Sequence, residues 1–219
     1  MFSNRRVVIS KYKEDVSWVK DLQCDYVIYN KDNSITDYNA FSLRENGEYD
    51  LCNVGREGHT YLFHILKNYD NLRNFEIFVH GNPFDHFKDF ISFANSKFLP
   101  EVMFLTECKL AYSGFPEEKS IHNVYRNGQH PFGCYDIREA QGLDANSVIS
   151  KATGLEIDKR NHEAFINAQF CVHRDVIKKW NKEVYKDMLI NFKDQNRVNN
   201  CSTKDGGMEF TWPQLFCFL

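Results

Sequence analysis

Three side chains that could bind a divalent cation follow the apolar run at residues 75–79. His80, Asp85 and His86 combine imidazoles with a carboxylate, and both groups are competent ligands for a divalent metal. A metal held there would suit a phosphohydrolase that releases phosphate from nucleotides. An ordinary polar turn before a helix explains the same residues, because glycine and proline stand among them.

A second candidate is the segment 53–59, Asn-Val-Gly-Arg-Glu-Gly-His, at the start of a predicted helix. Free backbone N–H groups at such a start, together with the Arg56 guanidinium, could meet phosphate or base oxygens. The segment matches neither GxxxxGK[ST] nor GxGxxG, and an ordinary capped helix with a salt-bridged arginine explains it equally well. His59 and His64 are five residues apart, which takes them off a common helical face and excludes an HExxH-like zinc pair.

Other catalytic patterns are missing from the sequence. It contains no GxSxG, no HExxH and no catalytic cysteine motif, which disfavours hydrolase readings. Its seven cysteines form no CxxC pair, so a reducing, cytoplasmic compartment is expected. The apolar run Val7-Val8-Ile9 is too short for a signal peptide or a membrane span. The 27 basic residues against 30 acidic ones leave a net charge of -3, which provides no field to attract nucleic acid.

Composition indicates a globular chain that forms its own core. The 219 residues are 42% hydrophobic and 26% charged, and their mean hydropathy is -0.53. Aromatic residues make up 15%, so several rings could be left over to stack on a flat ligand.

Strands and helices alternate along the first hundred residues. This pattern predicts a single α/β domain with a mostly parallel, twisted central sheet flanked by helices. The strands are expected at 6–10, 26–29, 75–79, 102–105 and 165–172. Helical segments are expected at 15–21, from about 56 to 71, at 84–97 and at 174–193, and loops at 30–50 and 113–134. Residues 209–216 form an amphipathic segment that closes the chain.

Ligands of open α/β sheets bind at the carboxyl ends of the strands. This rule nominates residues 10–15, 29–31 and 80–86 and the turn after Val172. The first three are unusually polar for segments that follow buried strands.

Four motifs occur in this order: Val7-Val-Ile-Ser-Lys-Tyr-Lys-Glu-Asp-Val-Ser-Trp, Asn53-Val-Gly-Arg-Glu-Gly-His-Thr-Tyr-Leu, Phe78-Val-His-Gly-Asn-Pro-Phe-Asp-His and Asn167-Ala-Gln-Phe. They resemble the fungal and viral group called domain of unknown function 3431. The pattern is also similar to the small GT-A glycosyltransferase domain with which large algal viruses decorate their major capsid protein. The resemblance implies a GT-A fold, a uridine diphosphate (UDP) sugar as donor, a glycan or glycoprotein acceptor, a hexosyltransferase activity and a divalent metal, most often Mn²⁺. A viral protein would act in the host cytoplasm.

Carried over residue by residue, the resemblance places donor-binding groups in three regions. The first loop supplies Ser10, Lys11, Tyr12 and Glu14, the second supplies Asn30 and Lys31, and the helix start supplies Gly55, Arg56 and His59. His80, Gly81 and Asn82 stand where such enzymes carry an Asp-x-Asp motif, and neither carboxylate of that motif is present. Asp85 is the nearest substitute, with His80 as a second metal ligand.

Sugar transfer also needs a carboxylate that deprotonates the acceptor hydroxyl. Glu163, Asp205 and Glu209 are all candidates, and the sequence does not separate them. The expected layout is a nucleotide-binding half over about residues 1–100 and an acceptor-side half over about 101–219. A non-catalytic module that binds nucleotides or carbohydrates is the alternative to an enzyme.

Overall fold

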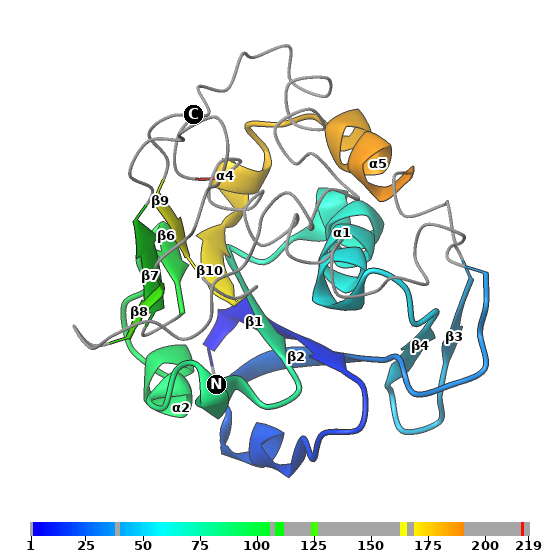
Figure 1. The fold of residues 1–219 in the computed structure, drawn as a ribbon, viewed down its shortest axis with the longest axis horizontal. Coiled ribbons are helices and arrows are strands. Elements are labelled where there is room, and N and C mark those ends of the chain that lie inside the picture. The colour runs from blue at the N-terminus through cyan, green and yellow to red at the C-terminus, as the bar shows by residue number, and fades with distance from the viewer. Residues whose placement is uncertain are drawn as a thin grey trace.

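A mixed sheet forms the centre of the protein. The structure, a computed structural model, describes residues 2–37, 40–105, 108–111, 124–126, 163–165, 169–190 and 216. Seven strands make up the main sheet: β1 (Phe2–Lys11), β2 (Cys24–Asn30), β3 (Phe41–Leu43), β4 (Tyr49–Leu51), β5 (Phe75–His80), β6 (Val102–Phe104) and β10 (Phe170–His173). Their order across the sheet is β3-β4-β2-β1-β5-β10-β6 (Figure 1).

Four neighbouring strands of this sheet are parallel. β1 pairs in parallel with both β2 and β5, and β2 pairs in parallel with β4. β3 is antiparallel to β4, and β10 is antiparallel to both β5 and β6. The α/β class is therefore confirmed, but the prediction of a mostly parallel sheet is wrong. Helical segments separate β1 from β2 and β4 from β5, but among the described residues none stands between β2 and β4, where the antiparallel strand β3 intervenes. β10 then joins the sheet in the reverse direction.

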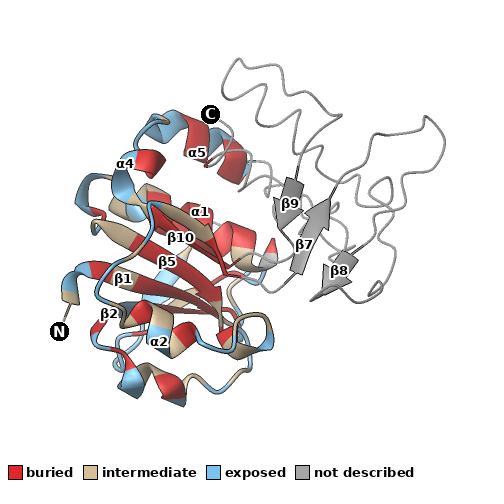
Figure 2. Ribbon diagram, turned by 90° about the vertical axis from the view of Figure 1, so that its left-hand side faces the viewer, coloured by how far each residue is buried: buried red, intermediate tan, exposed pale blue. Residues whose placement is uncertain are grey.

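Each face of the sheet is covered by helices, as Figures 1 and 2 show. The helical segments are η1 (Ser17–Asp21), α1 (Arg56–Asn68), η2 (Tyr69–Asn71), η3 (Pro83–Asp85), α2 (Phe90–Ala94), α4 (Arg174–Ile177) and α5 (Lys182–Ile190). Side chains alternate along β1, where Val8 packs towards α1 and α5 while Val7 and Ile9 pack towards η1 and α2. Two apolar layers, one on each face, thus enclose the strands.

Helix α1 begins at a sharp backbone turn. Gly55 precedes it with a φ of 54°, a left-handed conformation that glycine adopts without the steric cost of a Cβ. Tyr61, Leu62 and Ile65 are fully buried at helical spacing against the sheet. Because α1 leads from β4 to β5, which both belong to the parallel set, its amino end lies towards the carboxyl ends of these strands.

Several elements differ from those expected. The predicted loop at 30–50 contains the hairpin of β3 and β4, and the loop at 113–134 contains β8 (Val124–Arg126). The predicted strand 165–172 is two strands in different sheets, because β9 (Glu163–Phe165) pairs with β7 (Cys108–Ala111), which also pairs with β8. The helix expected at 174–193 is interrupted between α4 and α5, and that at 84–97 is reduced to η3 and α2.

In the described part of the chain, none of the helices is long and apolar enough to cross a membrane.

Candidate functional site

The sheet reverses its strand order at β1. From β1 the chain goes to β2 and β4 on one side, and then returns to β5 on the other side. Open α/β sheets bind ligands in the crevice outside the carboxyl ends of the strands at such a switch point. The segments that follow β1 and β5, residues 12–16 and 81–89, therefore define the candidate site.

The two segments pack directly against each other. A Cβ on Gly81 would lie 2.7 Å from Oε2 and 2.8 Å from Cβ of Glu14, so only glycine leaves room for that side chain. Trp18 Nε1 donates a hydrogen bond of 2.9 Å to the Gly81 carbonyl. Glu14 Oε2 in turn accepts a 2.7 Å hydrogen bond from the Tyr12 backbone N–H. Glu14 is thereby fixed beside the end of β5.

A backbone hydrogen bond defines the tautomer of His80, the last residue of β5. Its Nδ1 accepts a hydrogen bond of 3.3 Å from the Asn82 backbone N–H. A neutral imidazole that accepts at Nδ1 carries its proton at Nε2. That Nε2 atom is buried and has no hydrogen-bond partner among the described residues. The His86 ring lies nearly perpendicular to it, with centroids 5.2 Å apart. At the end of β5, the buried Nε2–H donor of His80 thus has no partner among the described residues.

Carboxylates from three different segments act on this imidazole. Burial lowers the pKa of His80 below its ordinary value. The carboxylates of Glu57, Asp85 and Glu14 oppose the shift, and His86 adds to it. The predicted pair of His80 and Asp85 therefore lies in one electrostatic environment, together with Glu14. Glu57 was missed because its position in the first turn of α1 reads as ordinary helix-dipole compensation.

These residues do not make a metal site by themselves. Among the described residues, no group of three or more histidine, cysteine, aspartate or glutamate side chains is arranged to hold a metal ion. Carboxylates are a donor type that suits Mn²⁺. A cation at the switch point would therefore have to take most of its ligands from a bound anion.

Two predicted donor-binding residues, Ser10 and His59, pack inside the protein. Ser10 is buried on β1, and its hydroxyl oxygen lies 2.9 Å from that of Thr60, which is buried on α1. His59 is fully buried on the same helix, and its ring stacks on Phe63 with centroids 6.5 Å apart. Both residues position α1 relative to the sheet.

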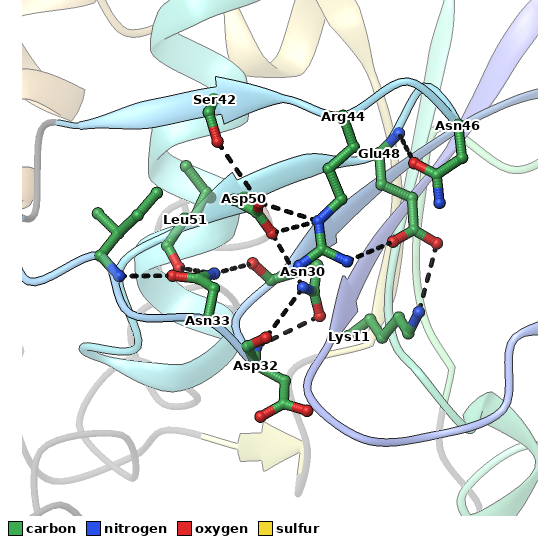
Figure 3. A network of polar contacts seen from close by, with 11 residues as sticks. Lys11, Asn30, Asp32, Asn33, Ser42, Arg44, Asn46, Glu48, Asp50 and Leu51 are labelled. Atoms are coloured by element: carbon green, nitrogen blue, oxygen red, sulfur yellow. Dashed lines mark hydrogen bonds and ion pairs between the residues drawn. The ribbon is translucent and has the colours of Figure 1, made fainter.

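Asn30, at the end of β2, belongs to a polar network with the β3–β4 hairpin (Figure 3). Asn30 Nδ2 donates to Asp50 Oδ1 over 2.9 Å. Lys31 is only 3% exposed, and its ammonium donates over 2.6 Å to the carbonyl of Val54, just before α1. Lys11 Nζ reaches Glu48 Oε1 of the hairpin at 3.3 Å. Three predicted donor ligands thus already have partners within the chain.

Four other predicted residues have no described side chain. Arg56 is the first residue of α1, and Glu163 is the first residue of β9. Asp205 and Glu209 lie outside the described residues altogether. Gly55, which is buried, shapes the turn before α1.

A comparison with protein families gives one match. The family described as "Protein of unknown function (DUF3431)" matches residues 7–218, and the chain belongs to this family. Its description assigns no activity. Neither the curated proteins nor the solved structures include a match to the chain.

Proposed function

We propose that this protein is a glycosyltransferase of the GT-A type that uses a UDP-sugar as its donor. The observation that carries the proposal is the end of β5 at the switch point, where Glu14 packs against Gly81 and the neighbouring His80 has a buried Nε2 without a described partner. The carboxylates of Glu57, Asp85 and Glu14 all act on the pKa of this imidazole. A nucleotide diphosphate placed there is the ligand class that this part of an α/β sheet accommodates.

Charge at the switch point favours a diphosphate bound together with a cation. Three carboxylates beside a neutral imidazole repel a bare diphosphate, and Mn²⁺ would offset both charges. The carboxylates of Asp85, Glu14 and Glu57 would hold it. His80, the second metal ligand that the resemblance implied, carries its proton at Nε2, and its Nδ1 is already bonded by the Asn82 backbone N–H. When bound, the cation neutralises charge on the leaving UDP.

The chain's own groups supply the other requirements of donor binding. The Nε2–H of His80 is placed to donate a hydrogen bond to a phosphate oxygen, and it is paired with no described residue. Tyr12 is 43% exposed at the end of β1, so its ring is available to stack on a nucleobase. Asn82, next to His80, and Gly81 shape the turn that carries the imidazole.

The order of the parallel strands supports the same proposal. When only the parallel strands are numbered along the chain, β4, β2, β1 and β5 have the order 3-2-1-4. In dinucleotide-binding folds, 3-2-1 is the order of one mononucleotide-binding half, and strand 4 lies beside strand 1 across the switch point. The reversed strand β10 beyond β5 makes the sheet mixed, and the proposed nucleotide-binding half covers about residues 1–100.

The acceptor side is proposed on the resemblance alone. Residues 101–219 would bind a glycan or glycoprotein, in a viral setting the major capsid protein in the host cytoplasm. Glu163, Asp205 and Glu209 stay candidates for the base that deprotonates the acceptor hydroxyl.

The test is a panel of nucleotide sugars supplied with Mn²⁺. A bound UDP-sugar at a hundredfold excess over its dissociation constant should stabilise the fold by about 2.7 kcal/mol, and UDP should be released when an acceptor is present. Binding without turnover would favour the non-catalytic module. Release of phosphate from nucleotides that carry no sugar would favour a phosphohydrolase, and a panel without any binding would contradict the proposal.

A further inference from the structure

The ammonium of Lys11, at the end of β1, is paired with a carboxylate of the β3–β4 hairpin. Lys11 is the last residue of β1, and its Nζ lies 3.3 Å from Glu48 Oε1 (Figure 3). The two side chains are 22% and 11% exposed. A cation on the strand next to the proposed diphosphate is therefore neutralised by a carboxylate from the hairpin.

The second carboxylate oxygen of Glu48, Oε2, lies near a cation to which it is not hydrogen-bonded. Oε2 is buried and makes no hydrogen bond to any described residue. Arg44 Nη1 lies 3.9 Å from it, which is beyond hydrogen-bond distance but within reach of a small side-chain movement. The carboxylate thus faces two cations and is hydrogen-bonded to one of them.

The rest of the hairpin is fixed, so such a movement would be confined to side chains. Arg44 Nε is held by Asp50 at 2.8 Å, and Asp50 is held in turn by Asn30. The Glu48 backbone N–H donates to Asn46 Oδ1 over 3.1 Å, which fixes the turn. Arg44 can approach Glu48 without leaving Asp50, because different atoms of its guanidinium make the two contacts.

We propose that Glu48 is a positioning residue that exchanges cations when an anionic ligand binds. Lys11 leaves Glu48 for a phosphate oxygen of the ligand, and Glu48 closes onto Arg44. This inference rests on the proposed function, because the ligand that attracts Lys11 is the donor's diphosphate. Its consequence is that Glu48 opposes ligand binding in the unaltered protein, so that removing its charge should strengthen binding.

The test measures the affinity of UDP by calorimetry in the presence of Mn²⁺. Glu48→Gln should bind UDP about fivefold more tightly, because Lys11 no longer has to leave a partly buried ion pair. Glu45→Gln is the matched control, since it removes an exposed carboxylate from the same hairpin. Lys11→Met should bind more weakly, and adding Glu48→Gln to Lys11→Met should change the affinity no further than Glu45→Gln does.

Each outcome separates the exchange from the proposed function. Equal affinities for Glu48→Gln and Glu45→Gln, or a gain that persists in the Lys11→Met background, would overturn the exchange while the UDP site stands. Weaker binding by Glu48→Gln would show that Glu48 orients Lys11 for the ligand, and would overturn it too. If the unaltered protein binds no UDP with Mn²⁺, both proposals fall.

Discussion

Gly81 joins the two loops of the candidate site because a hydrogen in place of a side chain lets Glu14 pack against it. Gly81→Ala should lower the free energy of unfolding by about 1–3 kcal/mol, since the added methyl displaces the whole Glu14 side chain rather than a flexible tip. It should also shift the emission of Trp18, whose indole bonds the Gly81 carbonyl. Urea unfolding and tryptophan fluorescence measure the two effects.

Gly47→Ala is the control for backbone strain alone. Gly47 has a φ of 83° and nothing within 4 Å of the added Cβ. Gly47→Ala should lower the free energy of unfolding by about 1–2 kcal/mol and leave the tryptophan emission unchanged. If Gly81→Ala behaved in the same way, close packing against Glu14 would not be the reason for this glycine.

A buried titratable cluster lies under α1, away from the candidate site. His64 is fully buried, with Nδ1 2.9 Å from the Tyr29 hydroxyl and Nε2 3.4 Å from Glu76 Oε2. Burial lowers the pKa of His64 below 6.5, Glu76 opposes that shift, and Arg6 and Lys67 reinforce it. The imidazole is therefore neutral in the folded protein.

This cluster predicts a loss of stability in acid. The lowered pKa means that the unfolded chain binds more protons than the folded one once the pH is below about 6.5. Above that pH, the contribution of His64 to the free energy of unfolding is complete. As the pH falls towards the folded-state pKa, this contribution decreases by at most about 1.4 kcal/mol per pH unit. Urea unfolding at pH 7.5 and 5.5 measures it. His64→Gln should show a smaller difference between the two pH values, and an unchanged difference would contradict the assignment.

At the scale of elements, the start of α1 depends on a buried lysine. Lys31 follows β2 and bonds the carbonyl of Val54, so it connects two segments that are distant in sequence. Lys31→Met keeps most of the side-chain volume and leaves that carbonyl without this donor. Hydrogen exchange at residues 52–58 should become faster, while Lys20→Met on the surface should leave it unchanged. Unaltered exchange in Lys31→Met would refute this role.

Local sequence patterns predicted some elements and not others. The β-branched runs that end at Ile9 and Val79 and the helical spacing from Tyr61 to Leu66 have strong periodicity, and β1, β5 and α1 confirm them. The β3–β4 hairpin was missed because each of its strands is only three residues long and lies in a stretch of mostly polar residues. The packing of Leu51 in the core and of Phe41 against Phe63 of α1 is a tertiary contact that so short an alternation does not reveal.

At the scale of the whole molecule, pairing between distant strands could not be read from the sequence. β10 lies between β5 and β6 although about 65 residues separate it from β6, and no local pattern specifies that insertion. The segments nominated at the carboxyl ends of β1 and β5 do lie together, because Glu14 packs against Gly81, next to His80. That they bind a ligand stays a prediction. Burial of Ser10, Lys31 and His59 depends on tertiary packing and was not predictable from residue type.

The central claim is that the switch point binds UDP together with a divalent cation. The most direct measurement is a calorimetric titration of Mn²⁺ with and without UDP, repeated on Asp85→Ala. The described residues contain no group of three metal-ligating side chains, so Mn²⁺ should bind weakly alone and at least tenfold more tightly with UDP, and Asp85→Ala should lose most of that gain. Tight binding of Mn²⁺ without UDP, or UDP binding that is equally strong in excess chelator, would contradict the account.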